Sequence, residues 1–97
     1  MSKVLSPFVQ LANAIALASR VHAGHFDKGG KPYILHPLHL MQQLLFDTEL
    51  AVIAVLHDVI EDSSGEITIE SLRSAGFSNR VCEAIALLTH ESGQDYL

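Results

Sequence analysis

The chain has 97 residues, of which 48% are apolar, and a formal net charge of −5 at pH 7. Its length predicts a single domain over residues 1–97 and leaves no room for a second one. Six Lys and Arg residues spread along the sequence argue against nucleic acid as a partner, and the lack of an apolar run of ~20 residues and of a secretory signal predicts a cytoplasmic protein without a membrane span.

The first predicted helix runs from about Pro7 to Ala23. Ser6 is a favourable N-cap, Pro7 suits the first helical position, and Gly24 is a typical terminator. His22 lies on the same stripe of this helix as four apolar residues, Phe8, Leu11, Ile15 and Ala18. We interpret His22 as a packed, hydrogen-bonded core histidine, with metal ligation as the alternative.

A turn-rich loop and a second helix follow. Residues 24–36 include a pair of glycines and a Lys-Pro step, which break regular structure. His36 lies just outside the second helix, which is predicted from about Pro37 to Phe46. The buried side of that helix is expected to consist of Leu38, Met41, Leu44 and Leu45.

The third predicted helix begins at a cap supplied by Asp47 or Thr48 and continues to residues 63–65, Ser-Ser-Gly. Every residue from Leu50 to Leu56 is apolar, so this helix is expected to enter the core before its polar end. The polar end carries the residues of greatest chemical interest.

Two more helices complete an all-α bundle of about five helices. Thr68 caps a short fourth helix closed by Gly76, and Ser78 caps a fifth that runs to about His90. Cys82, the only cysteine, falls within the apolar pattern of the fifth helix and is interpreted as a core residue rather than a nucleophile. The inward face of this helix is expected to include Val81, Ile85 and Leu88.

A cluster of four polar residues lies at the end of the third predicted helix. Residues four apart share a helix face, so His57 is expected to stand over Glu61 and Asp58 over Asp62. An imidazole beside a carboxylate is a plausible half-shell for a divalent metal, and the second acidic pair could orient or deprotonate a bound water. The alternative is a solvated helix end whose acids merely cluster.

A third ligand for such a metal is available in His36, which Pro37 fixes at a junction between loop and helix. Short loops make the second and third helices antiparallel neighbours, which could bring His36 to the polar cluster. The mixture of imidazole and carboxylate without thiolate suits Mn, Fe, Co or Zn better than a structural zinc knuckle.

Three separated motifs carry a resemblance to a known family. They are residues 25–37 (HFDKGGKPYILHP), residues 55–62 (VLHDVIED) and residues 75–77 (AGF). In this order they resemble the HD-domain hydrolases of the RelA/SpoT family and their small stand-alone relatives, from about Ala12 to Tyr96. The resemblance implies an all-helical, HD-domain-like, metal-dependent phosphohydrolase, and the best-known members remove the 3′-pyrophosphate from ppGpp and pppGpp.

The resemblance also implies roles for individual residues. His36, His57 and Asp58 match the metal ligands, usually of manganese, whereas Glu61 and Asp62 match the acids that position and activate the attacking water. Lys28 matches a basic residue that contacts the nucleotide. The family usually has Arg-Lys where this chain has Asp-Lys at positions 27 and 28.

One element of the family pattern has no counterpart. The fourth metal ligand is an aspartate on a later helix, which no residue of this chain matches, and we expect the chain to lack the C-terminal helices of the full family domain. The chain could be a fragment, another subunit could complete the site, or three protein ligands and water could hold the metal. Asp95 is a further candidate ligand.

The leading functional hypothesis is therefore a metal-dependent phosphohydrolase that acts on a small nucleotide such as (p)ppGpp. A non-catalytic, shortened HD domain that binds metal or nucleotide and acts as a dimeric interaction module is the alternative, and a purely structural helical assembly domain is the third. The high apolar fraction and the missing helices favour a homo-oligomer, most simply a dimer.

Overall fold

The computed structural model describes residues 3–94 of the chain. These residues form five helices of six or more residues and the single-turn helix α4. Their only β-structure is an isolated antiparallel bridge between Phe26 and Pro32, so the predicted all-α fold is confirmed. In chain order the helices are α1 (Pro7–Val21), α2 (Leu35–Gln43), α3 (Thr48–Leu56), α4 (Val59–Asp62), α5 (Ile69–Ser74) and α6 (Asn79–Gln94).

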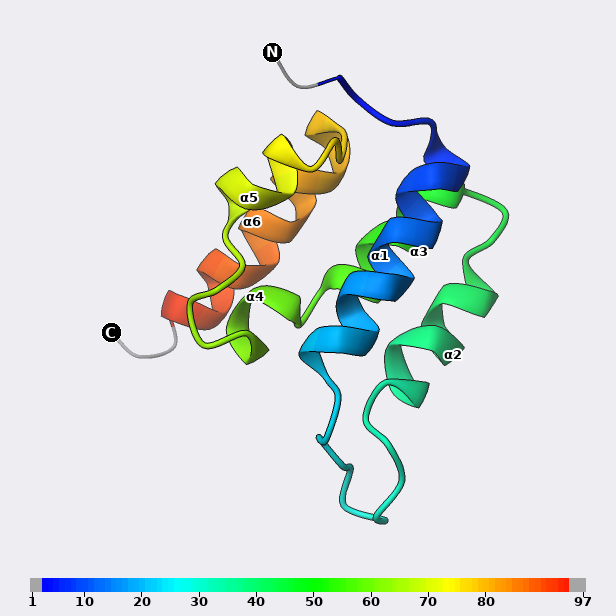
Figure 1. Ribbon diagram of the computed structural model, residues 1–97, viewed down its shortest axis with the longest axis vertical. Coiled ribbons are helices and arrows are strands. Elements are labelled where there is room, and N and C mark those ends of the chain that lie inside the picture. Colours follow the sequence, from blue (N-terminus) through cyan, green and yellow to red (C-terminus); the bar gives the residue numbers. More distant parts are fainter. Residues whose placement is uncertain (1–2, 95–97) are drawn as a thin grey trace.

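Helix α3 is the centre of the bundle. It packs against α1, α2 and α6, while α5 packs on α6 and α4 packs on α1 (Figure 1). The unbroken apolar sequence from Leu50 to Leu56 explains the central position of α3. A helix that is apolar on every side is stable only when other elements surround it. Five of its residues are buried, namely Ala51, Val52, Ala54, Val55 and Leu56.

The predicted helix starts are largely confirmed because the capping side chains make the expected bonds. Ser6 Oγ accepts a hydrogen bond from the Val9 amide at 3.4 Å, and Asp47 Oδ1 accepts one from Leu50 at 3.2 Å. Thr68 forms a reciprocal capping box with Ser71. The exception is α2, which begins before Pro37 and therefore includes His36.

The third predicted helix is wrong as a continuous element. Helix α3 ends at Leu56, and His57 and Asp58 form a turn before α4 begins. The backbone of Asp58 leaves the α-region, with φ −109° and ψ 2°. The four polar residues therefore do not lie on one uninterrupted helix face, although the Asp62 amide still donates to the Asp58 carbonyl at 3.0 Å.

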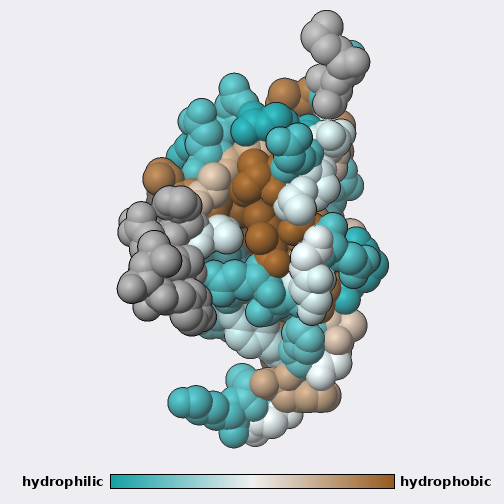
Figure 2. Space-filling model, turned by 90° about the vertical axis from the view of Figure 1, so that its left-hand side faces the viewer, coloured by the Kyte–Doolittle hydropathy of each residue, from teal (hydrophilic) through white to brown (hydrophobic). Residues whose placement is uncertain are grey.

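A continuous core joins α1, α3, α5 and α6, and it confirms Cys82, Val81 and Ile85 as buried. Three residues expected on buried faces are exposed instead: Phe8 (77%), Leu45 (50%) and Leu88 (43%). Periodicity gives the apolar side of a helix, but it does not say how far along the helix a neighbour covers that side. Apolar residues also gather in the middle of the face shown in Figure 2.

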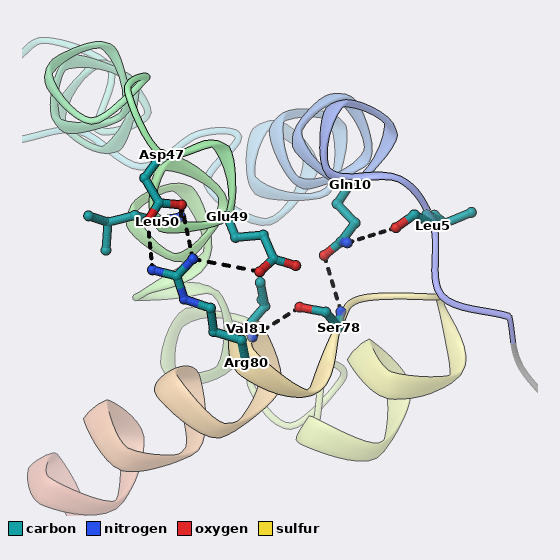
Figure 3. A network of polar contacts seen from close by, with 8 residues as sticks. All are labelled: Leu5, Gln10, Asp47, Glu49, Leu50, Ser78, Arg80 and Val81. Atoms are coloured by element: carbon teal, nitrogen blue, oxygen red, sulfur yellow. Dashed lines mark hydrogen bonds and ion pairs between the residues drawn. The ribbon is translucent and has the colours of Figure 1, made fainter.

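Polar contacts tie the N-terminal segment and the start of α6 to α1 and to the start of α3 (Figure 3). The buried Gln10 side chain donates to the Leu5 carbonyl at 2.8 Å and accepts from the Ser78 amide at 3.1 Å. On the other side of the network, the Arg80 guanidinium makes two bonds to the Asp47 carboxylate, at 2.9 and 2.8 Å. Within residues 3–94, no helix has the length and apolar composition that crossing a membrane requires.

Substitution of Gly76 should destabilise the fold more than substitution of a glycine in open space. Both Gly76 and Gly65 have positive φ, +100° and +87°, but an added Cβ at Gly76 would lie 2.7 Å from Leu5 Cγ, whereas Gly65 has nothing within 4 Å. We expect Gly65→Ala to cost about 1–2 kcal/mol of unfolding free energy and Gly76→Ala about 1–3 kcal/mol more. Urea denaturation measures both, and equal losses would contradict the close approach.

The ion pair between Arg80 and Asp47 should make the stability of the fold depend on pH in the acidic range. The guanidinium holds the pKa of Asp47 below its ordinary 3.8, so the pair stabilises the fold at neutral pH and loses its effect as pH falls through the lowered pKa. Arg80→Gln should therefore lower the melting temperature at pH 7, with a difference from wild type that shrinks below pH 3.8. Arg20→Gln, which breaks an exposed pair with Glu66, is the control and should show a smaller effect. A difference that stays constant down to pH 2 would exclude this pair as its cause.

Candidate metal centre

The imidazole of His57 closes the end of α3. Its Nδ1 lies 2.7 Å from the carbonyl oxygen of Ala54, one of the last carbonyls of the helix, which have no partner within the helix itself. Because a carbonyl can only accept, Nδ1 carries the proton of this bond. In the neutral ring, the lone pair then belongs to Nε2, and Nε2 faces the carboxylate of Asp58 at 3.1 Å.

Two side chains contact the same carboxylate oxygen of Asp58, Oδ2. Tyr33 donates its hydroxyl to Oδ2, and His57 Nε2 contacts that oxygen as well. His57 and then Tyr33 lower the pKa of Asp58 to about 2. In turn, burial and the bond to Asp58 raise the pKa of Tyr33, and Asp58 raises the pKa of His57 despite its partial burial. The carboxylate is therefore an anion at neutral pH.

These contacts fit a bound cation. A neutral His57 places the Nε2 lone pair against a carboxylate oxygen, and two electron-rich atoms at this distance are stable only with a positive charge between or beside them. A proton on Nε2 or a divalent metal can supply that charge. Imidazole nitrogen and carboxylate oxygen together are a donor set that suits Mn, Fe, Co and Zn.

The structure brings His36 to the same place. His36 lies in the first turn of α2 and is exposed. Its ring centroid is 6.0 Å from that of His57 and 5.9 Å from that of Tyr33. The rings of His36 and His57 are therefore neighbours, and His57 contacts Asp58 directly. Among the described residues, however, the ligand atoms of these three side chains do not all lie within 4.8 Å of one another, so His36 would have to move closer to share one ion with His57 and Asp58.

The remaining predicted site residues have different surroundings. Glu61 and Asp62 are exposed on α4, and Asp62 Oδ2 lies 3.4 Å from His22 Nδ1. Lys28 lies in a loop that projects beyond the helices (Figure 1). Asp27, which stands where the family usually has an arginine, stabilises the turn of this loop, because its Oδ1 accepts hydrogen bonds from the Gly29 and Lys31 amides, both at 2.9 Å. Asp95 lies outside the described residues.

His22 is buried as predicted, but its expected hydrogen bonds are absent. The residue is 1% exposed, and neither ring nitrogen has a hydrogen-bond partner within the described part of the chain. Burial lowers the pKa of His22, although Asp62 and Asp58 act in the opposite direction. Ligand atoms of His22, His25 and Asp62 all lie within 4.8 Å of one another, so a second group of metal-ligating side chains lies beside the predicted one.

Sequence reasoning missed Tyr33, which links the two groups. Its ring centroid lies 4.9 Å from that of His22, and its hydroxyl binds Asp58. The position of Tyr33 in a functional loop, close to His36, was the available signal. The second group also had a signal, since His22 and His25 are three residues apart around a glycine turn.

Comparison with known proteins gives relatives of one kind. No family model matches the chain. It is 32% identical over 92% of its length to a guanosine-3′,5′-bis(diphosphate) 3′-pyrophosphohydrolase of Aquifex aeolicus, and 35% identical over 77% to a Vibrio cholerae protein of the same name. It is 39% identical over 55% to the bifunctional (p)ppGpp synthase/hydrolase RelA of Mycobacterium tuberculosis. The chain covers 13%, 11% and 8% of the lengths of these three relatives.

Removal of the Tyr33 hydroxyl should raise the pKa of Asp58 in protein stripped of metal by a chelator. Because His57 contributes more than Tyr33 to the low pKa of Asp58, Tyr33→Phe should leave that pKa below the ordinary 3.8, and His57→Gln should raise it further. Carboxyl carbon shifts followed by NMR during a pH titration measure both. An Asp58 pKa that stays at about 2 in Tyr33→Phe would contradict the shared-oxygen arrangement.

Proposed function

The chain belongs to the RelA/SpoT family of HD-domain-like proteins, and from this membership we propose that it is a metal-dependent phosphohydrolase. Its proposed substrate is guanosine-3′,5′-bis(diphosphate) or a closely related nucleotide, from which it removes the 3′-pyrophosphate. The relatives of this chain that are named guanosine-3′,5′-bis(diphosphate) 3′-pyrophosphohydrolase support this choice of reaction. The contact between His57 Nε2 and the Asp58 carboxylate, a nitrogen and an oxygen donor side by side, is the observation that carries the proposal.

The proposed metal ligands are His36, His57 and Asp58. The Ala54 carbonyl supports this assignment because it fixes the proton on Nδ1 of His57 and so presents Nε2 as a donor atom. When bound, a divalent cation would polarise the phosphoryl oxygens and lower the pKa of a water molecule. We propose manganese as that cation, since a mixture of imidazole and carboxylate without thiolate suits it.

Glu61 and Asp62 are the proposed acids for the attacking water. A carboxylate near the water accepts its proton while the water oxygen bonds to the phosphorus attached to the 3′ oxygen. The bond from that phosphorus to the 3′ oxygen breaks, the 3′ oxygen takes up a proton, and pyrophosphate leaves. Both acids are on the single turn of α4, directly after the His57–Asp58 turn, which supports this role.

Lys28 is the proposed contact to the nucleotide, with Lys31 as a second cation. Both are exposed in the loop between α1 and α2. Their ammonium groups can therefore contact phosphate oxygens without leaving a buried position in the fold. The bonds from Asp27 keep this loop closed. We place the protein in the cytoplasm, where a soluble nucleotide is available.

A second candidate function is a non-catalytic module that binds metal or nucleotide and associates with itself. The exposed apolar residues Phe8 and Leu88 and the apolar region in Figure 2 favour it, since large exposed apolar areas commonly mark interaction surfaces. Analytical ultracentrifugation tests self-association, and a monomer at all concentrations would exclude the dimeric module.

Hydrolysis assays with added Mn²⁺ separate the two functions. Wild-type protein should release pyrophosphate from ppGpp, and Glu61→Gln should reduce the turnover number by about 10²–10⁴-fold while keeping its metal, because a proton acceptor is lost. Glu70→Gln, which changes an exposed acid of α5, is the matched control and should keep full activity. His57→Ala should lose bound metal and activity together. Metal binding without turnover of any guanosine nucleotide would favour the non-catalytic module, and full activity of Glu61→Gln would refute the assigned acid.

A further inference from the structure

We propose that His22, His25 and Asp62 form a second cation site, suited to a divalent transition metal of the Zn²⁺ or Co²⁺ class. Its ligands are distinct from the proposed ligands of the first metal, His36, His57 and Asp58, although Asp62 is also one of the two acids of the proposed hydrolase mechanism. It is inferred from the mutual distances of the three side chains and from the burial of one of them.

Two elements bring the three side chains together. His22 is the C-cap of α1, and a turn at Gly24, with φ +84°, brings the chain round to His25. Asp62 is the last residue of α4, and α4 packs against α1 (Figure 1). The backbone of His25 is held on both sides, since its amide donates to the His22 carbonyl at 2.9 Å and its carbonyl accepts from Tyr33 at 2.8 Å.

The distances between the donor atoms agree with one shared ion. One ligand atom from each of the three residues lies within 4.8 Å of the other two. His22 Nδ1 and Asp62 Oδ2 are 3.4 Å apart, which is too long for a good hydrogen bond. Two ligands placed about 2.0–2.1 Å from a tetrahedral ion are separated by about 3.4 Å. The pair therefore has the spacing of two ligands of one metal.

The burial of His22 is the independent observation. Both of its ring nitrogens are buried without a hydrogen-bond partner among the side chains that the structure describes, which end at residue 89, and an unsatisfied buried polar group costs about 1–3 kcal/mol. A cation bound to one nitrogen supplies the missing partner. His25 and Asp62 are exposed, so they leave a path for the ion to enter and leave open positions for water, as in zinc sites with three protein ligands.

The side chain of Tyr33 lies next to both proposed metal sites. The ring of Tyr33 lies between them, with centroids 4.9 Å from His22 and 5.9 Å from His36. A cation at the second site would hold the Oδ2 atom of Asp62 toward α1. On the proposed hydrolase mechanism, Glu61 is then the acid that remains free to accept a proton from water.

Metal counting with single-site variants tests the second site. Chelator-treated protein is dialysed to equilibrium against Co²⁺ and its cobalt content is measured by mass spectrometry, together with the visible absorption of the bound ion. Wild type should bind two ions per chain, and His25→Gln and His36→Gln should each bind one. His39→Gln, which changes an exposed histidine of α2, is the matched control and should bind two.

The outcomes distinguish the two sites. One ion that is lost only in His36→Gln would overturn the second site and leave the proposed hydrolase centre in place. One ion that is lost only in His25→Gln would support the second site and refute the proposed ligands of the first. Two ions in His25→Gln would overturn the second site. Anomalous diffraction from crystals soaked in Zn²⁺ gives a direct check, since a peak is expected between His22 and Asp62 and its absence would also overturn the proposal.

Discussion

The hydrogen bond from His57 Nδ1 to the Ala54 carbonyl is the contact on which the candidate centre depends. It satisfies one of the carbonyls that the end of α3 leaves without a partner in the helix, and so helps the helix to end at Leu56. The same bond decides which nitrogen of His57 carries a lone pair and turns that nitrogen toward Asp58. Helix termination and the electrostatics of the site thus have a common cause.

Much of the fold could be predicted from local sequence signals. Ser6, Asp47 and Thr68 cap helices as their residue types predict, because an N-cap is satisfied by neighbours three residues away. The apolar run of α3 correctly predicted that this helix enters the core. The family resemblance predicted His36, His57 and Asp58 as a group; in the structure His57 contacts Asp58 and the His36 ring lies 6.0 Å from the His57 ring, so their shared role as ligands stays a prediction.

What the sequence could not predict depends on contacts between distant residues. Neither His57 nor Asp58 is a helix breaker, so periodicity alone extended α3 through them. Tyr33 reaches Asp58 across 25 positions of sequence, and no spacing rule finds such a pair. A stripe on α1 predicted that His22 is buried, but helical spacing could not show that its nitrogens have no hydrogen-bond partner among the described side chains, because that depends on how other elements pack around the end of α1.

The single turn of α4 limits how this segment can change in length. Helical residues are rotated by about 100° each around the axis, so one residue inserted between Asp58 and Asp62 would turn the acids of α4 away from α1. The turn has little room to absorb such a shift, because Val59 within it and Ser63 directly after it are buried, and the next two residues, Ser64 and Gly65, have positive φ. The loop around Gly29 has no buried residue between Ala23 and Pro32, so insertions and deletions there are compatible with the bundle, and divergence in length should concentrate in that loop.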